Sequence, residues 1–150
     1  MPGTTKKMPA SPALPESISI LVVSPHHEDL AALRSILHHV HWDISQVSTV
    51  QQAERHMQSN APPVVLCECD LPDGGWKNVL RSINASASRP LLLVVSRRAD
   101  EALWAEVLNL GGYDVLLKPF DTSEVVRVVG MAWRHWFNRP LSLAAAAKTA

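Results

Sequence analysis

The sequence predicts an α/β domain in which helices cover both faces of a parallel, five-stranded sheet. Short runs of apolar, often β-branched residues recur along the chain, and they alternate with stretches whose apolar residues repeat at helical spacing. The apolar runs show little polar alternation, which is typical of strands buried on both faces. With 150 residues, of which 47% are hydrophobic, the chain is long enough for one domain with a single core.

The expected strands occupy residues 18–23, 42–47, 64–69, 91–95 and 113–117. Parallel strands of this kind are joined by right-handed crossovers. We predict strand order 2-1-3-4-5, which is the doubly wound (βα)5 arrangement of flavodoxin-like folds. This order places the switch point, where such folds bind ligands, between the first and third strands.

Amphipathic helices are expected between the strands, over residues 27–39, 50–58, 76–83, 99–110 and 122–137. Ser48 or Thr49 precedes the second of these helices and Asp121 precedes the last, and all three are residue types that cap helix N-termini. Gly111 follows the fourth helix, where glycine commonly ends a helix.

The domain is expected to span residues 18–137. Residues 1–17 are rich in Pro, Ser, Thr and Lys and are expected to form a disordered leader. Residues 138–150 are expected to form a tail that is flexible or partly helical. No apolar run approaches the length of a membrane span, and residues 1–17 lack the continuous apolar segment of a secretory signal. We therefore expect a cytoplasmic protein.

Charge and cysteine content exclude several classes of protein. The 14 basic residues balance the 14 acidic residues, so neither a nucleic acid nor an anionic membrane is an expected partner. Cys67 and Cys69 lie one residue apart on a predicted strand, where a disulfide between them would be strained. Reduced thiols in a cytosolic protein are the preferred interpretation.

The stretch PVVLCECDLPDGGW, residues 63–76, ends a buried strand at the carboxylate of Glu68. Asp70 follows two residues later, and the Pro and Gly residues after it favour a turn. In open parallel sheets, the carboxyl ends of the strands form the rim at which ligands bind. The predicted strand order brings four segments together at this rim: Ser24-Pro25-His26, Glu68, Ser96 and Lys118.

In these residues the chain resembles a response-regulator receiver domain of two-component signalling, over about residues 18–137. The resemblance rests on ILVV with a polar turn, VVLCECDLPDGG, LLLVVS and GGYDVLLKPF, in this order. It implies phosphorylation of an aspartate after the third strand, with Mg²⁺ held by a pair of acids after the first. It also implies that Ser96 and Lys118 are the residues that contact the phosphoryl group, and that the peptide bond before Pro119 is cis.

The sequence departs from the receiver pattern at the rim. Ser24 and Pro25 replace the pair of acids, and neither offers the anionic oxygens that Mg²⁺ prefers. Glu68 stands at the phosphoacceptor position. Val115 occupies a position at which receivers often carry a switching Tyr or Phe. We therefore expect the Mg²⁺ site to be lost, no cofactor to be bound, and Lys118 to pair with Glu68.

These departures predict a degenerate receiver, or pseudo-receiver, that signals through protein contacts without phosphorylation or enzymatic turnover. Two versions of this hypothesis remain open. In one, the Lys118–Glu68 ion pair permanently resembles the activated state of a receiver. In the other, Glu68 is a tolerated residue in a scaffold that no longer undergoes phosphorylation. The alternative is a phosphorylatable regulator of a phosphorelay that accepts the phosphoryl group at Glu68 or Asp70.

Protein partners are expected at the surface formed by the fourth helix, fifth strand and fifth helix, which receivers commonly use. Trp104, Trp133 and Trp136 lie in these two helices and are candidate interface anchors. Equally, Trp133 can pack in the core and Trp136 can cover the end of the chain. The candidate partners are a histidine kinase, an output protein or a second copy of the chain.

Two further hypotheses have weaker support. A hydrolase that uses Cys67 or Cys69 would need an exposed thiol beside a base, and the sequence has no nucleophile elbow. A metal site at His38 and His41, which share a helix face, lacks a carboxylate or cysteine at matching spacing. For these histidines we prefer a solvated helix end favoured by the helix dipole.

Overall fold

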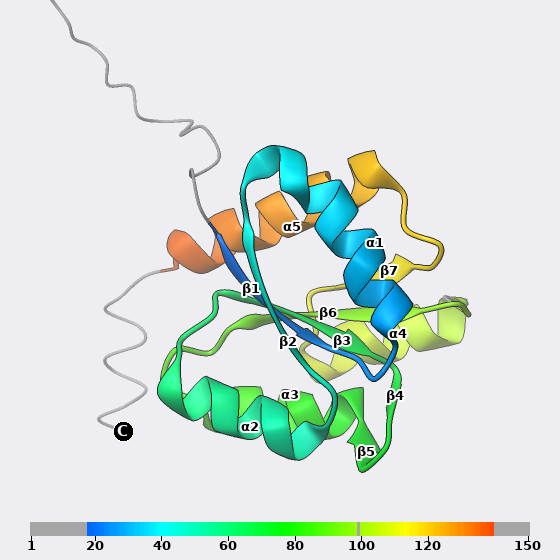
Figure 1. Cartoon of the computed structure of the whole chain (residues 1–150). Coiled ribbons are helices and arrows are strands. Elements are labelled where there is room, and N and C mark those ends of the chain that lie inside the picture. The colour runs from blue at the N-terminus through cyan, green and yellow to red at the C-terminus, as the bar shows by residue number, and fades with distance from the viewer. Residues whose placement is uncertain (1–17, 99, 140–150) are drawn as a thin grey trace, which may run out of the picture.

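The computed structural model describes residues 18–98 and 100–139. A five-stranded sheet in the order β2-β1-β3-β6-β7 lies between two layers of helices (Figure 1). Counted within this sheet alone, the strand order is 2-1-3-4-5, and every adjacent pair is parallel, so the predicted fold class is confirmed. The predictions for residues 1–17 and 140–150 fall outside the described part of the chain.

The strands of the sheet lie within one residue of their predicted bounds. They are β1 (Ser19–Val23), β2 (Asp43–Val47), β3 (Val64–Glu68), β6 (Leu91–Ser96) and β7 (Asp114–Leu117). β1 lies between β2 and β3, with Val23 opposite both Val47 of β2 and Cys67 of β3. The chain segments that follow β1 and β3 therefore leave the sheet at the same rim.

The helices follow the predicted order. They are α1 (His27–Leu37), α2 (Val50–Ser59), α3 (Trp76–Ala85), α4 (Glu101–Leu110) and α5 (Thr122–Phe137). The first helix ends earlier than expected, because a 3₁₀ turn, η2 (His38–Val40), replaces its last residues. His41 then adopts a left-handed backbone with φ of 55° and leads the chain into β2.

The predicted helix caps are confirmed, and Thr49 is the residue that caps α2. The side chain of Thr49 accepts a hydrogen bond from the backbone N–H of Gln52, and Asp121 accepts one from Glu124. Gly111 ends α4 with a φ of 106°, a conformation that glycine adopts at little cost.

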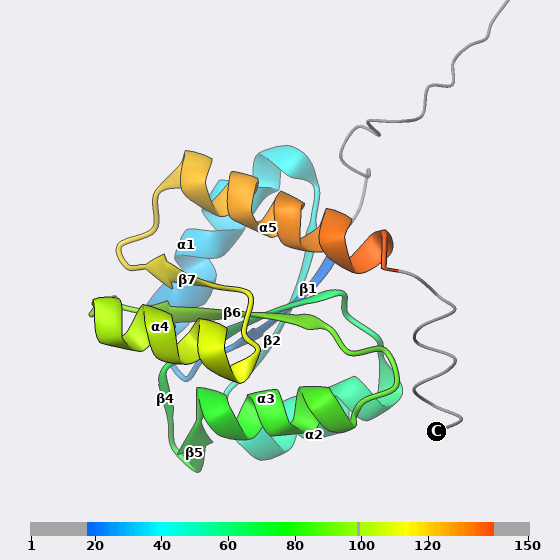
Figure 2. The same ribbon diagram turned by 180° about the vertical axis from the view of Figure 1, so that it is seen from behind.

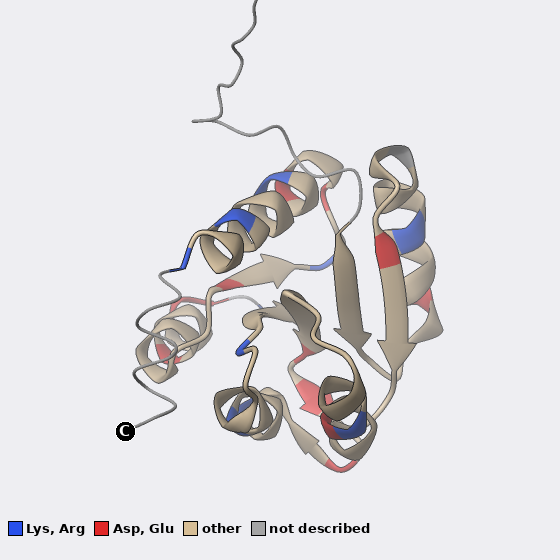
Figure 3. Ribbon diagram, turned by 90° about the vertical axis from the view of Figure 1, so that its left-hand side faces the viewer, with Lys and Arg blue, Asp and Glu red and all other residues tan. Residues whose placement is uncertain are grey.

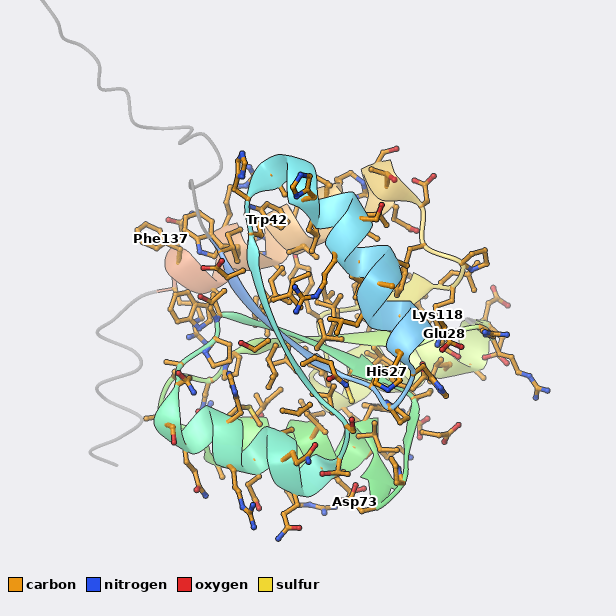
Figure 4. All side chains as sticks on the ribbon, in the orientation of Figure 1. His27, Glu28, Trp42, Asp73, Lys118 and Phe137 are labelled. Carbon is orange, nitrogen blue, oxygen red and sulfur yellow. The ribbon has the colours of Figure 1, made fainter. Side chains whose placement is uncertain are left out.

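A small antiparallel hairpin, β4 (Asp70–Leu71) and β5 (Gly74–Gly75), stands where only a turn was predicted. At its tip, the Asp73 carboxylate accepts hydrogen bonds from the backbone N–H groups of Val50 at 2.7 Å and Gln51 at 3.1 Å (Figure 4). These hydrogen bonds lower the pKa of Asp73, and the bond from Val50 has the largest effect. Asp73 therefore attaches the hairpin to the N-terminus of α2.

Each face of the sheet has its own apolar core. α1 and α5 cover one face, and α2, α3 and α4 cover the other (Figures 1 and 2). Along β3, Leu66 packs on the α1–α5 side and Cys67 packs on the opposite side. Because side chains alternate along a strand, Glu68 follows Leu66 and is directed to the side of α1 and α5.

None of the helices in residues 18–98 and 100–139 is long and apolar enough to cross a membrane.

Candidate functional site

The ends of β3 and β7 bring Glu68 and Lys118 into contact, as the sequence predicted. Lys118 Nζ lies 2.5 Å from Glu68 Oε1. The two side chains are 7% and 11% exposed, for Lys118 and Glu68 respectively, so the ion pair is largely withdrawn from water. The Lys118–Pro119 peptide bond is cis, which agrees with the resemblance.

Asp29 is a second partner of Lys118, and the sequence analysis did not anticipate it. Lys118 Nζ donates to Asp29 Oδ2 at 3.0 Å and to Oδ1 at 3.2 Å. Asp29 belongs to the first turn of α1, and Figure 4 shows Lys118 beside this end of the helix. The sequence did carry a signal: Asp29 shares the buried stripe of α1 with Leu33 and Leu37, and an acid on such a stripe needs a buried partner.

Ser24 completes the cluster from the end of β1. Its hydroxyl donates to Asp29 Oδ2 at 2.8 Å and accepts from the backbone N–H of His26 at 3.1 Å. Ser24 and Asp29 are both buried, with 3% and 4% of their surfaces exposed. Ser24 therefore contacts Asp29, while the adjacent Pro25 is half-buried in the turn before α1. We call Ser24, Asp29, Glu68 and Lys118 the rim cluster.

The rim cluster holds one ammonium between two carboxylates. Burial opposes the charge of Lys118, but the hydrogen bonds that Lys118 donates to Glu68 and Asp29, together with the charges of these acids, outweigh burial and raise the pKa of Lys118. The ammonium has three N–H donors, and three carboxylate oxygens lie within hydrogen-bonding distance of its nitrogen. Lys118 is therefore charged at neutral pH and is bound to both carboxylates.

A cleft of about 590 Å³ opens beside the rim cluster. Ser96 and Asp70 both line this cleft, as do Arg97 and Arg98. The Ser96 hydroxyl accepts a hydrogen bond from the backbone N–H of Arg98 at 3.0 Å. Ser96 and Asp70 thus lie where the sequence placed them, in the wall next to Glu68 and Lys118.

The described thiols and histidines give no support to the alternative hydrolase and metal sites. Burial raises the pKa of Cys67, and burial followed by the charge of Asp70 raises the pKa of Cys69. Thiols of this kind contain little thiolate at neutral pH and are weak nucleophiles. Among the described side chains of residues 18–38, 40–98 and 100–139, no group of three or more His, Cys, Asp and Glu is arranged to hold a metal ion.

The three candidate tryptophans differ in exposure. Trp104 on α4 is 50% exposed, and its Nε1 donates to Asp114 Oδ1 at 3.0 Å. Trp133 is half-buried against the α1–α5 core and stacks on Phe137 with ring centroids 5.0 Å apart. Trp136 is half-buried and donates to the backbone carbonyl of Ser88 at 3.0 Å. Trp104 is therefore the most accessible of the three.

Exposed large apolar side chains gather on the same part of the fold. Within the described residues they all belong to α4, β7 and the end of α5: Trp104, Leu108, Leu110, Leu117 and Phe137, which are between 40% and 62% exposed. β7 is an edge strand and lies next to α4. We call Trp104, Leu108, Leu110 and Leu117 the α4–β7 surface.

Comparison with known proteins shows which family this chain resembles in sequence. Residues 20–130 match the family model described as response regulator receiver domain. The chain is 30% identical over 116 residues to the transcriptional regulatory protein KdpE of Mycobacterium tuberculosis, covering 77% of this chain and 51% of KdpE. It is 24% identical over 135 residues to the two-component response regulator-like APRR1 of Arabidopsis thaliana, covering 87% of this chain and 21% of APRR1. The chain thus spans about half of KdpE and a smaller part of APRR1.

Solved structures share the fold. The receiver domain of the sensor histidine kinase PA1611 from Pseudomonas aeruginosa, with a magnesium ion in its active-site cleft, has a TM-score of 0.70 and 22% identity, over 78% of this chain and 98% of that one. A two-component response regulator from Clostridium difficile has a TM-score of 0.71 and 20% identity, over 81% of this chain and 99% of that one. Because the family model covers most of the described residues, the chain belongs to the response regulator receiver domain family.

Proposed function

We propose that this chain is a receiver that signals through protein contacts and is not itself phosphorylated. The observation that carries the proposal is the engagement of Lys118, whose ammonium lies 2.5 Å from Glu68 and 3.0 Å from Asp29. The family resemblance implies that this lysine contacts a transferred phosphoryl group. Here its ammonium already forms ion pairs with two buried carboxylates, and contact with a phosphoryl group would compete with these pairs.

The position of Glu68 also argues against phosphoryl transfer. Transfer requires an acceptor oxygen that is free and in line with the leaving group. The Glu68 side chain is 11% exposed, and its Oε1 atom is bound to Lys118. Phosphorylation at Oε1 would therefore have to displace the lysine first.

Mg²⁺ is the ion that the resemblance implies, and the rim residues do not suit it. Ser24 and Pro25 stand at the positions of the pair of acids. The carboxylates of Asp29 and Glu68 both accept hydrogen bonds from Lys118. Mg²⁺ requires oxygen ligands in near-octahedral geometry, and an ammonium between the two carboxylates repels a divalent cation. The proposed function therefore uses no Mg²⁺ and includes no enzymatic turnover.

Signalling without phosphorylation needs a surface that a partner can bind. Receiver domains interact with kinases or output domains. We propose that a histidine kinase, an output protein or a second copy of this chain docks on the α4–β7 surface, with Trp104 as an anchor because it is large and 50% exposed. Acidic and basic residues are interspersed over the elements in Figure 3, which favours a protein partner in the cytoplasm over nucleic acid or a membrane.

Phosphorylation can be tested directly by incubating the protein with acetyl phosphate and Mg²⁺ and measuring its intact mass. A receiver with an aspartate acceptor and a complete pair of acids serves as the positive control. We expect no addition of a phosphoryl group to this chain. A hydroxylamine-sensitive adduct that disappears in Glu68→Gln or in Asp70→Asn would contradict the proposal and would identify the acceptor.

A further inference from the structure

We infer that the Lys118 ammonium takes the place of a bound divalent cation, and that Asp29 is the positioning residue that holds it there. Lys118 Nζ lies between carboxylates from two different elements, Asp29 from α1 and Glu68 from β3. Two carboxylates that converge on one point are a usual ligand set for a small divalent cation, with water in the remaining positions. In this chain the converging point is filled by a cation that is covalently part of β7.

The arrangement of donors supports a specific role for Asp29. Lys118 contacts both oxygens of Asp29, at 3.0 Å and 3.2 Å, but contacts Glu68 through Oε1. The Asp29 carboxylate is fixed in turn by the Ser24 hydroxyl at 2.8 Å. The Ser24 oxygen accepts from the backbone N–H of His26 at 3.1 Å. A chain of hydrogen bonds therefore runs from the turn before α1 through Ser24 and Asp29 to the ammonium.

This chain of bonds gives Ser24 a function at a position where the resemblance implies an acid. A serine hydroxyl is a weak ligand for Mg²⁺, but it is a good donor to a buried carboxylate. Asp29 supplies the missing negative charge from the first turn of α1, and Ser24 orients it. The buried negative charge at the end of β1 is therefore relocated to α1.

The inference rests on the proposed function in one respect, which is that the wild-type site binds no divalent cation. It goes further in predicting what the site becomes when the internal cation is removed. In Lys118→Met the side chain keeps a similar length but loses its charge, so Asp29 and Glu68 are left converging on a vacated point. We expect this variant to bind a divalent cation at least about tenfold more tightly than the wild type, because repulsion by the ammonium is removed.

Mn²⁺ is a suitable probe, because its paramagnetism allows binding to be measured by water-proton relaxation. The titration compares wild type, Lys118→Met, Lys118→Arg and the double variant Lys118→Met/Asp29→Asn. We expect tight binding in Lys118→Met, weak binding in Lys118→Arg, which keeps the charge, and loss of the gain in the double variant. Equal weak binding in wild type and Lys118→Met overturns the inference and leaves the proposed function standing. Tight binding by the wild type overturns both, and equal binding by Lys118→Met and the double variant overturns the role of Asp29.

A second measurement keeps the inference testable if Lys118→Met does not fold. An ammonium held by buried carboxylates exchanges its protons slowly, so Lys118 Nζ should give an observable NMR ammonium signal in the wild-type protein. We expect Asp29→Asn to broaden or remove this signal and Glu28→Gln, on the same turn but exposed, to leave it unchanged. A signal that persists in Asp29→Asn would overturn the positioning role.

Discussion

The rim cluster lies at the carboxyl ends of the strands, and the α4–β7 surface lies along the edge strand of the same sheet. The two regions differ in burial and in polarity. In the rim cluster every member is buried or nearly so, and charged and polar atoms are paired with one another. On the α4–β7 surface Trp104, Leu108 and Leu117 are between 40% and 50% exposed. The polar groups of the rim cluster thus have partners within the chain, whereas the apolar side chains of the α4–β7 surface are exposed to water.

The difference indicates where this receiver communicates with other molecules. A polar site that binds a ligand must release its internal partners first, and buried ion pairs are costly to separate. An exposed apolar surface needs no such release, because covering it with a partner is favourable. The rim cluster therefore links α1, β3 and β7 internally, and this contrast supports the α4–β7 surface as the proposed site of contact.

Removing one acid from the rim cluster should have the largest effect on stability. Asp29→Ala leaves the Lys118 ammonium buried with one acidic partner and is expected to lower the free energy of unfolding by about 3 kcal/mol. Chemical denaturation measures this change. The control is Glu28→Ala, which removes the same charge from an exposed position on the same turn. If the two variants are equally stable, the rim cluster does not contribute to folding.

Alkaline pH should weaken the same cluster. The pKa of Lys118 is raised above its ordinary value of 10.5, so its contribution to stability is complete below that pH and is lost as pH rises through the folded-state value. Unfolding measured across this range should show a steeper alkaline loss in the wild type than in Lys118→Met. Lys77→Met is the control, because Lys77 pairs with Glu106 at an exposed position and its removal should leave the alkaline loss of the wild type unchanged.

Truncating the α4–β7 surface should have a smaller effect on folding and a larger one on association. Leu117→Ala is expected to change the free energy of unfolding by less than about 1 kcal/mol, whereas the neighbouring Leu116→Ala, at a fully buried position, should cost about 3 kcal/mol. Denaturation of both variants measures this contrast. If both variants lose a similar free energy of unfolding, Leu117 is packed within the domain and is not available to a partner.

Sedimentation velocity then tests a second copy of the chain as the partner. If the wild type associates, Trp104→Ala should weaken the association without unfolding the domain. Association that is unaffected by Trp104→Ala would place the contact on another surface. A wild type that stays monomeric at all concentrations would favour a kinase or an output protein over a second copy.

The smallest expected effect lies away from both regions, at the hairpin. The pKa of Asp73 is lowered from 3.8, so its contribution to stability is present above that pH and is lost as pH falls through the folded-state value. Asp73→Asn should lower the melting temperature slightly at neutral pH and lose this acid dependence. Thermal unfolding at neutral and at acidic pH measures it, and an unchanged acid dependence would mean that the bonds to Val50 and Gln51 are not the source.

Most of the sheet and the Glu68–Lys118 contact followed from the sequence for one physical reason. Glu68 ends β3 and Lys118 directly follows β7, and parallel topology delivers strand ends to a common rim. Asp29 did not follow, because it lies on a helix and reaches the rim through the angle at which α1 packs on the sheet. Helix packing angles depend on side-chain contacts from the whole core and cannot be read from one segment.

The hairpin and the exposure of the tryptophans also depend on contacts between distant segments, which the sequence of one segment does not predict. Pro72 and Gly74 predict a turn, but the short β4–β5 pairing depends on contact between Asp73 and α2, far away in the sequence. The spacing of Trp133 and Trp136 on α5 allowed either burial or exposure. Their half-buried state depends on Phe137 and on the carbonyl of Ser88, which the sequence alone could not bring together.

The most direct test of a closed, phosphorylation-independent rim is an NMR titration of the wild-type protein with Mg²⁺, followed by beryllofluoride. The amide signals of Glu68, Ser96 and Lys118 report on the cleft and on both partners of the ion pair. We predict that none of the three signals moves with either addition. Shifts that saturate with Mg²⁺ and change again with beryllofluoride would mean that the site binds the ion and a phosphoryl analogue, which would contradict the central claim.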